Sequence, residues 1–119
     1  MENLEKLINT IVEAMDDKKA QGIVSLDLSG FDGAICSNFV VCHADSTTQV
    51  DAISQSIEEK VFEVMGEWPV RVEGRQNAFW VAMDYSDVIV HIFQTELRDF
   101  YRLEELWADA PMKRYEFGD

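Results

Sequence analysis

Few side chains of this 119-residue chain could perform chemistry, since two histidines and two cysteines accompany 23 acidic residues. Metal-dependent phosphoryl transfer usually needs carboxylates that converge on one or two ions, and two acids at positions i and i+2 of a strand face the same side. No two acidic residues of this chain are separated by two positions. The sequence therefore argues against a polymerase-type or nucleotidyltransferase-type active site.

The remaining candidates for a metal or acid/base site centre on the two histidines. His43 with Asp45, or His91 with Asp84 and Asp87, could form such a site if the fold brought them together. The alternative for His91 is a half-buried strand histidine that is hydrogen-bonded to a carboxylate or backbone carbonyl, or that lies at an interface. We favour this alternative, because neither histidine has the ligand spacing of a helical metal site.

Motifs for nucleophilic catalysis and for nucleotide binding are absent from the sequence. It contains no Gly-x-Ser-x-Gly elbow, no Gly-x-Gly-x-x-Gly and no Gly-x-x-x-x-Gly-Lys-Ser/Thr pattern. Cys36 and Cys42 lie in an apolar setting without a Cys-x-x-Cys pair, so we interpret them as buried free thiols. The sequence predicts no catalytic residue set, no metal and no cofactor.

Charge and length restrict the partners and the organisation of the chain. A net charge of −13 disfavours direct binding to nucleic acid or to an anionic membrane, and favours a basic partner. The length fits one domain that spans residues 1–119. The N-terminus lacks a basic segment followed by an apolar one, and no apolar run approaches the roughly 20 residues of a spanning helix, which predicts a cytoplasmic protein.

Hydrophobic periodicity predicts three helices and five strands. The expected elements are a helix over 3–17, strands over 23–28 and 38–44, a helix from Ser46 to Gly66, a strand over 68–73, a hairpin of strands 79–83 and 88–93, and a helix that begins near Thr95. The tail from about Met112 onward is expected to be loosely held. This order predicts a single α/β (α+β) domain with a mixed five-stranded sheet packed by helices.

Aromatic side chains are concentrated in the last third of the chain. Six of them fall within 28 residues, among acidic residues and arginine: Trp80, Tyr85, Phe93, Phe100, Tyr101 and Trp107. Aromatic residues and arginine are over-represented at the energetic centres of protein interfaces, although some of these side chains must fill the core. The pattern predicts a docking surface for another protein.

The same region resembles a known family. The run 84–93 reads Asp-Tyr-Ser-Asp-Val-Ile-Val-His-Ile-Phe, and 98–107 reads Arg-Asp-Phe-Tyr-Arg-Leu-Glu-Glu-Leu-Trp. Both are similar to sequences of the Iojap family, also called ribosomal silencing factors. The resemblance extends upstream through 18–20, 26–29, 39–42, 49–53 and 71–74. The chain departs from the family at Ser37-Asn38, where Asp-Tyr is usual, and at 43–46, where a Gly-Asn-Ser type of turn is common.

The resemblance implies a nucleotidyltransferase-like fold that has lost its catalytic acids. It also implies a translational repressor that binds the large ribosomal subunit through ribosomal protein L14 on the intersubunit face and hinders joining of the small subunit when nutrients are scarce. Together with the aromatic pattern, it predicts partner contacts by Trp80, Asp84, Tyr85, Asp87, His91, Phe93, Arg98, Tyr101 and Trp107. Phe100, Leu103 and Leu106 are predicted to support that surface.

Two other functions remain open at this point. A residual nucleotide-handling enzyme of the same fold is the alternative to the repressor, and nucleotide with magnesium would then stabilise the protein. A homodimer is the other possibility, because an exposed hairpin and an aromatic helix could bury each other. Dimer and ribosome could also compete for one surface.

Overall fold

The computed structural model of the chain describes residues 2–102, 105 and 107–117, apart from the side chains of residues 2 and 99–101. In chain order, the elements are α1 (Glu2–Asp17), β1 (Gln21–Asp27), β2 (Asn38–Ala44), α2 (Thr47–Met65), β3 (Arg71–Glu73), β4 (Trp80–Asp84), β5 (Val88–Gln94), α3 (Thr95–Tyr101) and β6 (Met112–Arg114). The predicted succession of helices and strands is confirmed up to α3.

The strands form one mixed sheet in the order β3-β4-β5-β2-β1-β6. β2 and β5 are parallel at its centre, and the other neighbouring pairs are antiparallel. Parallel strands need a long crossover, which α2, β3 and β4 provide here. Val40 pairs in register with Val90, and both are fully buried, as expected for strands covered on both faces.

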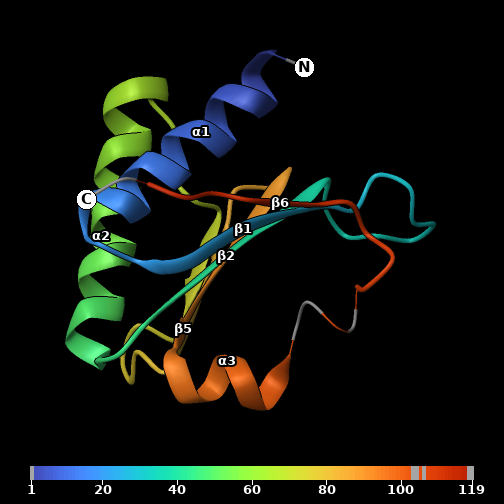
Figure 1. Cartoon of the computed structure of the whole chain (residues 1–119). Coiled ribbons are helices and arrows are strands. Elements are labelled where there is room, and N and C mark those ends of the chain that lie inside the picture. Colours follow the sequence, from blue (N-terminus) through green and yellow to red (C-terminus); the bar gives the residue numbers. More distant parts are fainter. Residues whose placement is uncertain (1, 103–104, 106, 118–119) are drawn as a thin grey trace.

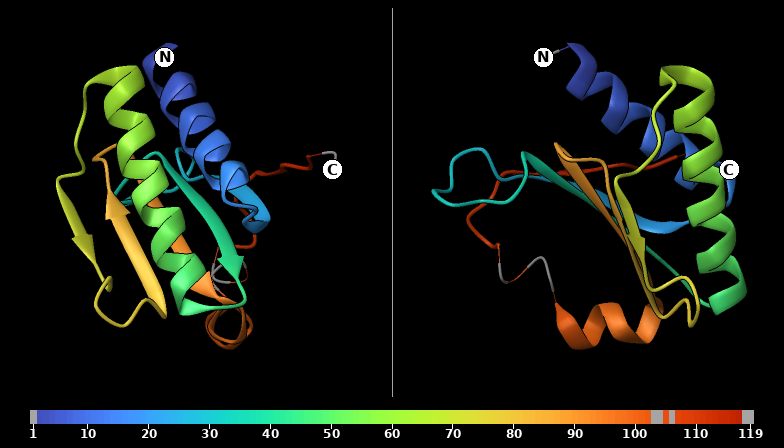
Figure 2. Two further views of the ribbon diagram at one scale, coloured as in Figure 1. Left: turned by 90° about the vertical axis from the view of Figure 1, so that its left-hand side faces the viewer. Right: turned by 180° about the vertical axis from the view of Figure 1, so that it is seen from behind.

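Helices α1 and α2 lie side by side on one face of the sheet, which we call the helix face (Figures 1 and 2). Helix α2 begins after Ser46, whose hydroxyl accepts a hydrogen bond from Gln49 N at 3.1 Å, and ends at Gly66, whose left-handed φ is 68°. Fully buried side chains from helices and strands meet there: Ile11, Met15, Val40, Val50, Ile53, Ile57, Val61, Val90 and Ile92. No helix in the described ranges is both long and apolar enough to cross a membrane.

The opposite face carries a second, smaller apolar cluster. Its buried members are Val24, Leu26, Leu28, Phe39, Val41, Phe93 and Ala110. Helix α3 lies against this face (Figure 2), and Leu97 from α3, Phe31 from the β1–β2 loop and Trp107 pack on the cluster. Short segments, rather than two long helices, therefore cover this side.

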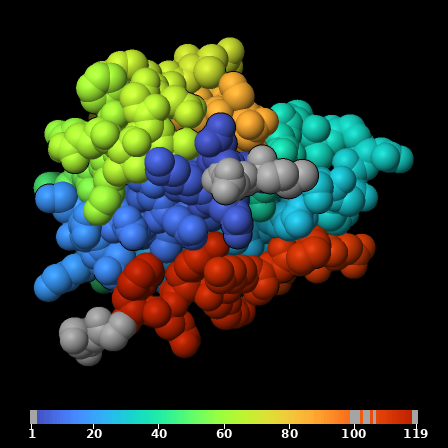
Figure 3. All heavy atoms as spheres, turned by 90° about the horizontal axis from the view of Figure 1, so that it is seen from above, coloured from blue at the N-terminus to red at the C-terminus, as the bar shows by residue number. Residues whose placement is uncertain are grey.

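The sheet has six strands where the sequence predicts five. Met112–Arg114, predicted as the start of a loosely held tail, pair antiparallel with β1. The following residue fastens the strand, because Tyr115 N donates to Ile23 O at 2.9 Å and the Tyr115 hydroxyl lies 3.2 Å from Ser25 Oγ. Figure 3 shows this C-terminal segment beside α1. All three β6 side chains are exposed, so backbone pairing rather than an apolar pattern defines the strand.

Candidate functional site

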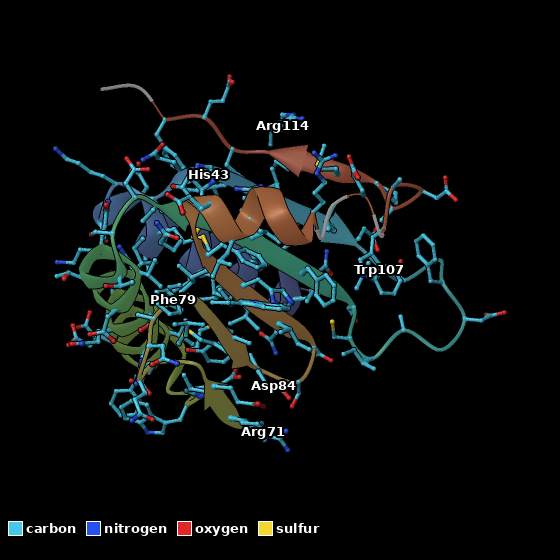
Figure 4. All side chains as sticks on the ribbon, turned by 90° about the horizontal axis from the view of Figure 1, so that it is seen from below. His43, Arg71, Phe79, Asp84, Trp107 and Arg114 are labelled. Atoms are coloured by element: carbon cyan, nitrogen blue, oxygen red, sulfur yellow. The ribbon has the colours of Figure 1, made fainter. Side chains whose placement is uncertain are left out.

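Within the described part of the chain, the face of the sheet opposite α1 and α2 is covered only in part: α3 packs on β5 and β2. In Figure 4, Asp84 and Arg71 lie side by side, clear of α3. Paired residues of antiparallel strands share a face, which places six residues together on the uncovered part. We call this part the open face; it consists of Arg71, Glu73, Trp80, Ala82, Asp84 and Ile89. Its middle is half-buried and mostly apolar, and its β3 edge is charged and exposed.

Trp80 is held on the open face by a histidine beneath it. Its indole Nε1 donates to His91 Nδ1 at 3.0 Å, and its ring stacks on Phe93 with centroids 4.9 Å apart. Because Nδ1 accepts, the neutral imidazole carries its proton on Nε2. His91 is 7% exposed, and this burial lowers its pKa to about 4. The histidine therefore stays neutral near pH 7 and fixes the orientation of Trp80.

The second ring nitrogen of His91 is buried without a hydrogen-bond partner among the described residues. The Phe39 ring meets the imidazole edge to face, with centroids 4.7 Å apart, and supplies no conventional acceptor. Within the described part of the chain, the Nε2 proton therefore has no conventional acceptor at the margin of the open face.

Trp107 stands at the other end of a connected series of rings. It packs edge to face on Phe31 and Phe39, with centroids 5.3 and 5.8 Å apart. Phe39 contacts His91, which binds Trp80. Aromatic contacts therefore run without interruption from the C-terminal segment, across β2 and β5, to β4.

Two of the predicted contact residues lie in the interior. Tyr85 is 5% exposed and belongs to the helix-face core, where its hydroxyl has no partner among the described residues. Burial raises the pKa of Tyr85 far above its usual range. Phe93 is fully buried under Trp80. Neither side chain presents area to a partner in this arrangement; both instead position the β4–β5 hairpin.

The two aspartates of the hairpin are tied to the backbone around them. Asp84 Oδ1 accepts from Ser86 N at 2.7 Å, which closes the turn. The carbonyl of Asp87 accepts from Ser37 N at 2.8 Å and Asn38 N at 3.2 Å, while its side chain is exposed. The position at which this chain departs from the usual Asp-Tyr therefore contacts the predicted site through its backbone.

His43 and Asp45 fasten α3 instead of forming a site together. Arg98 Nη1 donates to Gly22 O at 2.6 Å and lies 2.8 Å from His43 Nδ1. Asp45 accepts from Thr95 Oγ1 at 2.7 Å, and this hydrogen bond lowers the pKa of Asp45. No group of three or more histidine, cysteine or acidic side chains within the described part of the chain is arranged to hold a metal ion.

Four predicted residues lie outside what the structure describes. They are the side chains of Phe100 and Tyr101, and residues Leu103 and Leu106. Their predicted roles, in contact for Tyr101 and in support for the other three, stay predictions.

Comparison with known proteins decides the family. Residues 1–118 match the family described as ribosomal silencing factor during starvation. The chain belongs to this family, RsfS. The ribosomal silencing factor RsfS of Bacillus subtilis (strain 168) is 37% identical over 116 residues, which are 98% of this chain and 97% of that protein. A crystal structure of a Chromobacterium violaceum protein matches with a TM-score of 0.82 and 32% identity, over 87% of this chain and 85% of that chain.

A shorter match reaches a mouse protein. Mitochondrial assembly of ribosomal large subunit protein 1 is 33% identical over 39 residues, which are 33% of this chain and 17% of that protein. Membership of the RsfS family gives the chain a silencing role associated with the ribosome. Such a role is regulatory rather than catalytic.

Sequence reasoning missed four residues of the open face of this RsfS-family domain: Arg71, Glu73, Ala82 and Ile89. A signal for two of them was present, because Ala82 is two positions from Trp80 and Ile89 two positions from His91, and alternate strand residues share a face. Arg71 and Glu73 could not be placed in this way. Their position depends on the pairing of β3 with β4, which the sequence does not specify.

Proposed function

We propose that this protein binds the large ribosomal subunit through ribosomal protein L14 on the intersubunit face, and thereby blocks joining of the small subunit and damps translation during starvation. The observation that carries the proposal is the open face: an uncovered part of the sheet in an RsfS-family chain, with Trp80 fixed at its margin by a buried histidine. We assign the partner contact to this face and the site of action to the cytoplasm.

The composition of the open face suits a protein partner. Trp80, Ala82 and Ile89 offer half-buried apolar area, and tryptophan is among the residues that contribute most to interface affinity. Its orientation is already fixed by His91, so little side-chain entropy is lost on docking. A preorganised aromatic anchor of this kind favours a slow dissociation rate.

The charge of the chain suits a basic ribosomal protein. A net charge of −13 speeds encounter with a positively charged surface and opposes contact with ribosomal RNA. The same charge opposes pairing of two copies, so a homodimer through the open face would form best at high salt. The name of the mouse relative, which refers to assembly of the ribosomal large subunit, supports the choice of that subunit.

Gradient sedimentation tests the proposal directly. The purified protein is mixed with separated large and small subunits, and then with both together. We expect the protein to migrate with the large subunit and joined ribosomes to disappear. A protein that stays at the top of the gradient, or ribosomes that join as well as without it, would refute the proposal.

A matched pair of variants tests the open face. Ala82→Arg places a long cation in the middle of this face, whereas Asn9→Arg makes the same charge change on the exposed side of α1. We expect Ala82→Arg to weaken large-subunit binding at least about tenfold, which is about 1.4 kcal/mol, and Asn9→Arg to leave it nearly unchanged. Circular dichroism melting of both variants shows whether each remains folded. Equal binding by the two folded variants would move the contact elsewhere.

A further inference from the structure

A second exposed apolar patch lies outside the open face, at the end of α2. Phe62 and Trp68 stack with ring centroids 4.3 Å apart and planes 20° apart. Even so, Phe62 remains 44% exposed, Trp68 58% and the neighbouring Val70 72%. We call these three residues the apolar ridge. Clusters of exposed apolar side chains on a small soluble domain mark interaction sites more often than isolated ones do.

Local folding explains only part of the ridge. Gly66 ends α2 in the left-handed conformation and reverses the chain, so a contact between Phe62 and Trp68 closes the corner. One apolar contact across the helix end would be enough for that purpose. The corner does not account for the area that both rings still expose, nor for Val70 beside them.

The ridge and the open face flank the same edge strand. Val70 N donates to Asp84 O at 2.7 Å, which joins the ridge to the open face through the backbone. Val70 lies in the bend that leads into β3, directly before Arg71, and its side chain is exposed. β3 is the terminal strand of the described sheet, with β4 as its neighbour. A partner lying against the outer edge of β3 would therefore reach both surfaces.

The charge around the ridge identifies the chemistry of that partner. Glu67 directly precedes Trp68, is exposed, and forms no ion pair with another described residue, whereas Glu59 and Glu63 line a hollow with Lys18 and Lys60. Glu58, by contrast, is neutralised by Arg75 at 3.0 Å. An apolar patch beside an unpaired carboxylate, on a chain with a net charge of −13, complements a basic segment that carries apolar side chains. A second copy of this chain would bring the same net negative charge, so electrostatic repulsion disfavours it as the partner.

We propose that the docking surface continues from the open face around β3 onto the apolar ridge, where Phe62 and Trp68 receive apolar side chains of a basic protein segment on the large ribosomal subunit. This inference rests on the proposed function. It assigns two anchors to the complex, Trp80 on the sheet and the stacked pair beside α2, separated by the edge strand. If Trp80 were the only anchor, the apolar ridge would remain exposed to solvent in the complex.

Binding of purified large subunits by four proteins tests the ridge: the unmodified chain, Trp68→Ser, Phe117→Ser and Ala82→Arg. Phe117 is the matched control, since it is a 43% exposed aromatic outside any helix or strand. We expect Trp68→Ser to weaken binding about tenfold or more through faster dissociation, and Phe117→Ser to change it less than about twofold. Affinity of Trp68→Ser equal to that of the unmodified chain, with Ala82→Arg impaired, would overturn the ridge and leave the proposed function standing. Failure of the unmodified chain to bind would overturn both.

A charge variant provides a second test of the proposal in case Trp68→Ser does not fold. The triple change Glu59→Gln, Glu63→Gln and Glu67→Gln keeps the ridge intact and removes three exposed carboxylates from the end of α2 and the residue before Trp68. An equal change at Glu5, Glu13 and Glu116, all exposed, is the control. We expect the ridge triple alone to slow association and to flatten its dependence on salt concentration. Identical salt dependence in the two triple variants would also overturn the proposal.

Discussion

The two faces of the sheet are covered by different kinds of structure: long helices on one face and short segments on the other. The helix face lies under α1 and α2, which are 16 and 19 residues long, and many of its side chains are fully buried. Among the described residues, a seven-residue helix, a loop and a C-terminal segment cover the other face, and they leave part of it open. Regular amphipathic helices build the main core, whereas short segments leave aromatic groups accessible. The main core therefore lies on the helix face, whereas the proposed open-face contact with the ribosome lies on the other.

A pair of isoleucine truncations gives the largest expected difference between the faces. Ile57 on α2 is fully buried in the helix-face core, whereas Ile89 on the open face is half-buried. We expect Ile57→Ala to lower the free energy of unfolding by about 2–5 kcal/mol, because it leaves a cavity. Ile89→Ala should cost well under half of that and weaken large-subunit binding instead. Urea denaturation measures the first effect, and equal losses in the two variants would contradict the division of roles.

The next largest expected effect is the contribution of the buried His91 to the pH dependence of the free energy of unfolding. Its folded pKa of about 4 lies below the ordinary value of about 6.5, so the unfolded chain takes up the proton first. The contribution of neutral His91 to stability is complete above about pH 6.5 and is lost as the pH falls from there to about 4, by at most about 3 kcal/mol. His91→Asn keeps an acceptor for Trp80 but does not titrate in this range. We expect the free energy of unfolding of this variant to depend less steeply on pH between those values than that of the unmodified chain.

The comparison of the two unfolding curves isolates this histidine, because the carboxylates titrate alike in both proteins. Urea unfolding at about pH 7, 6 and 5 is sufficient. Parallel pH profiles would mean that His91 is not held neutral, and that its hydrogen bond to Trp80 does not preorganise the open face.

The helix face is the part of the fold that the sequence predicts well. Val50, Ile53, Ile57 and Val61 recur at spacings of three and four, so period alone assigns their face. β6 escapes prediction because its side chains are all exposed and its pairing with β1 is a long-range backbone interaction. Short edge strands of this kind carry no period.

The sequence predicts which face a residue of the candidate site occupies only for residues within one strand, where side chains alternate between the two faces. Trp80 and Asp84, both predicted contact residues, lie on one face of β4 because they are separated by an even number of strand positions. Tyr85 follows Asp84 at the turn and points into the helix-face core. The concentration of aromatic residues in this region does not distinguish such a core residue from a contact residue. Phe31, which completes the ring series with Trp107, comes from a loop without a period.

The smallest expected effect comes from two residues with left-handed backbone, one exposed in the hairpin turn and one buried in the helix-face core. Ser86 in the hairpin turn has φ 72° and is exposed, whereas Ala78 has φ 57° and its methyl is buried in the helix-face core. Glycine relieves the strain at either position, although it raises the entropy of the unfolded chain. We expect Ser86→Gly to raise stability by about 0.5 kcal/mol, and Ala78→Gly to gain nothing because the loss of a buried methyl costs about 0.8 kcal/mol. Calorimetric melting measures both, and an equal gain at Ala78 would show that the helix-face core does not extend to this corner.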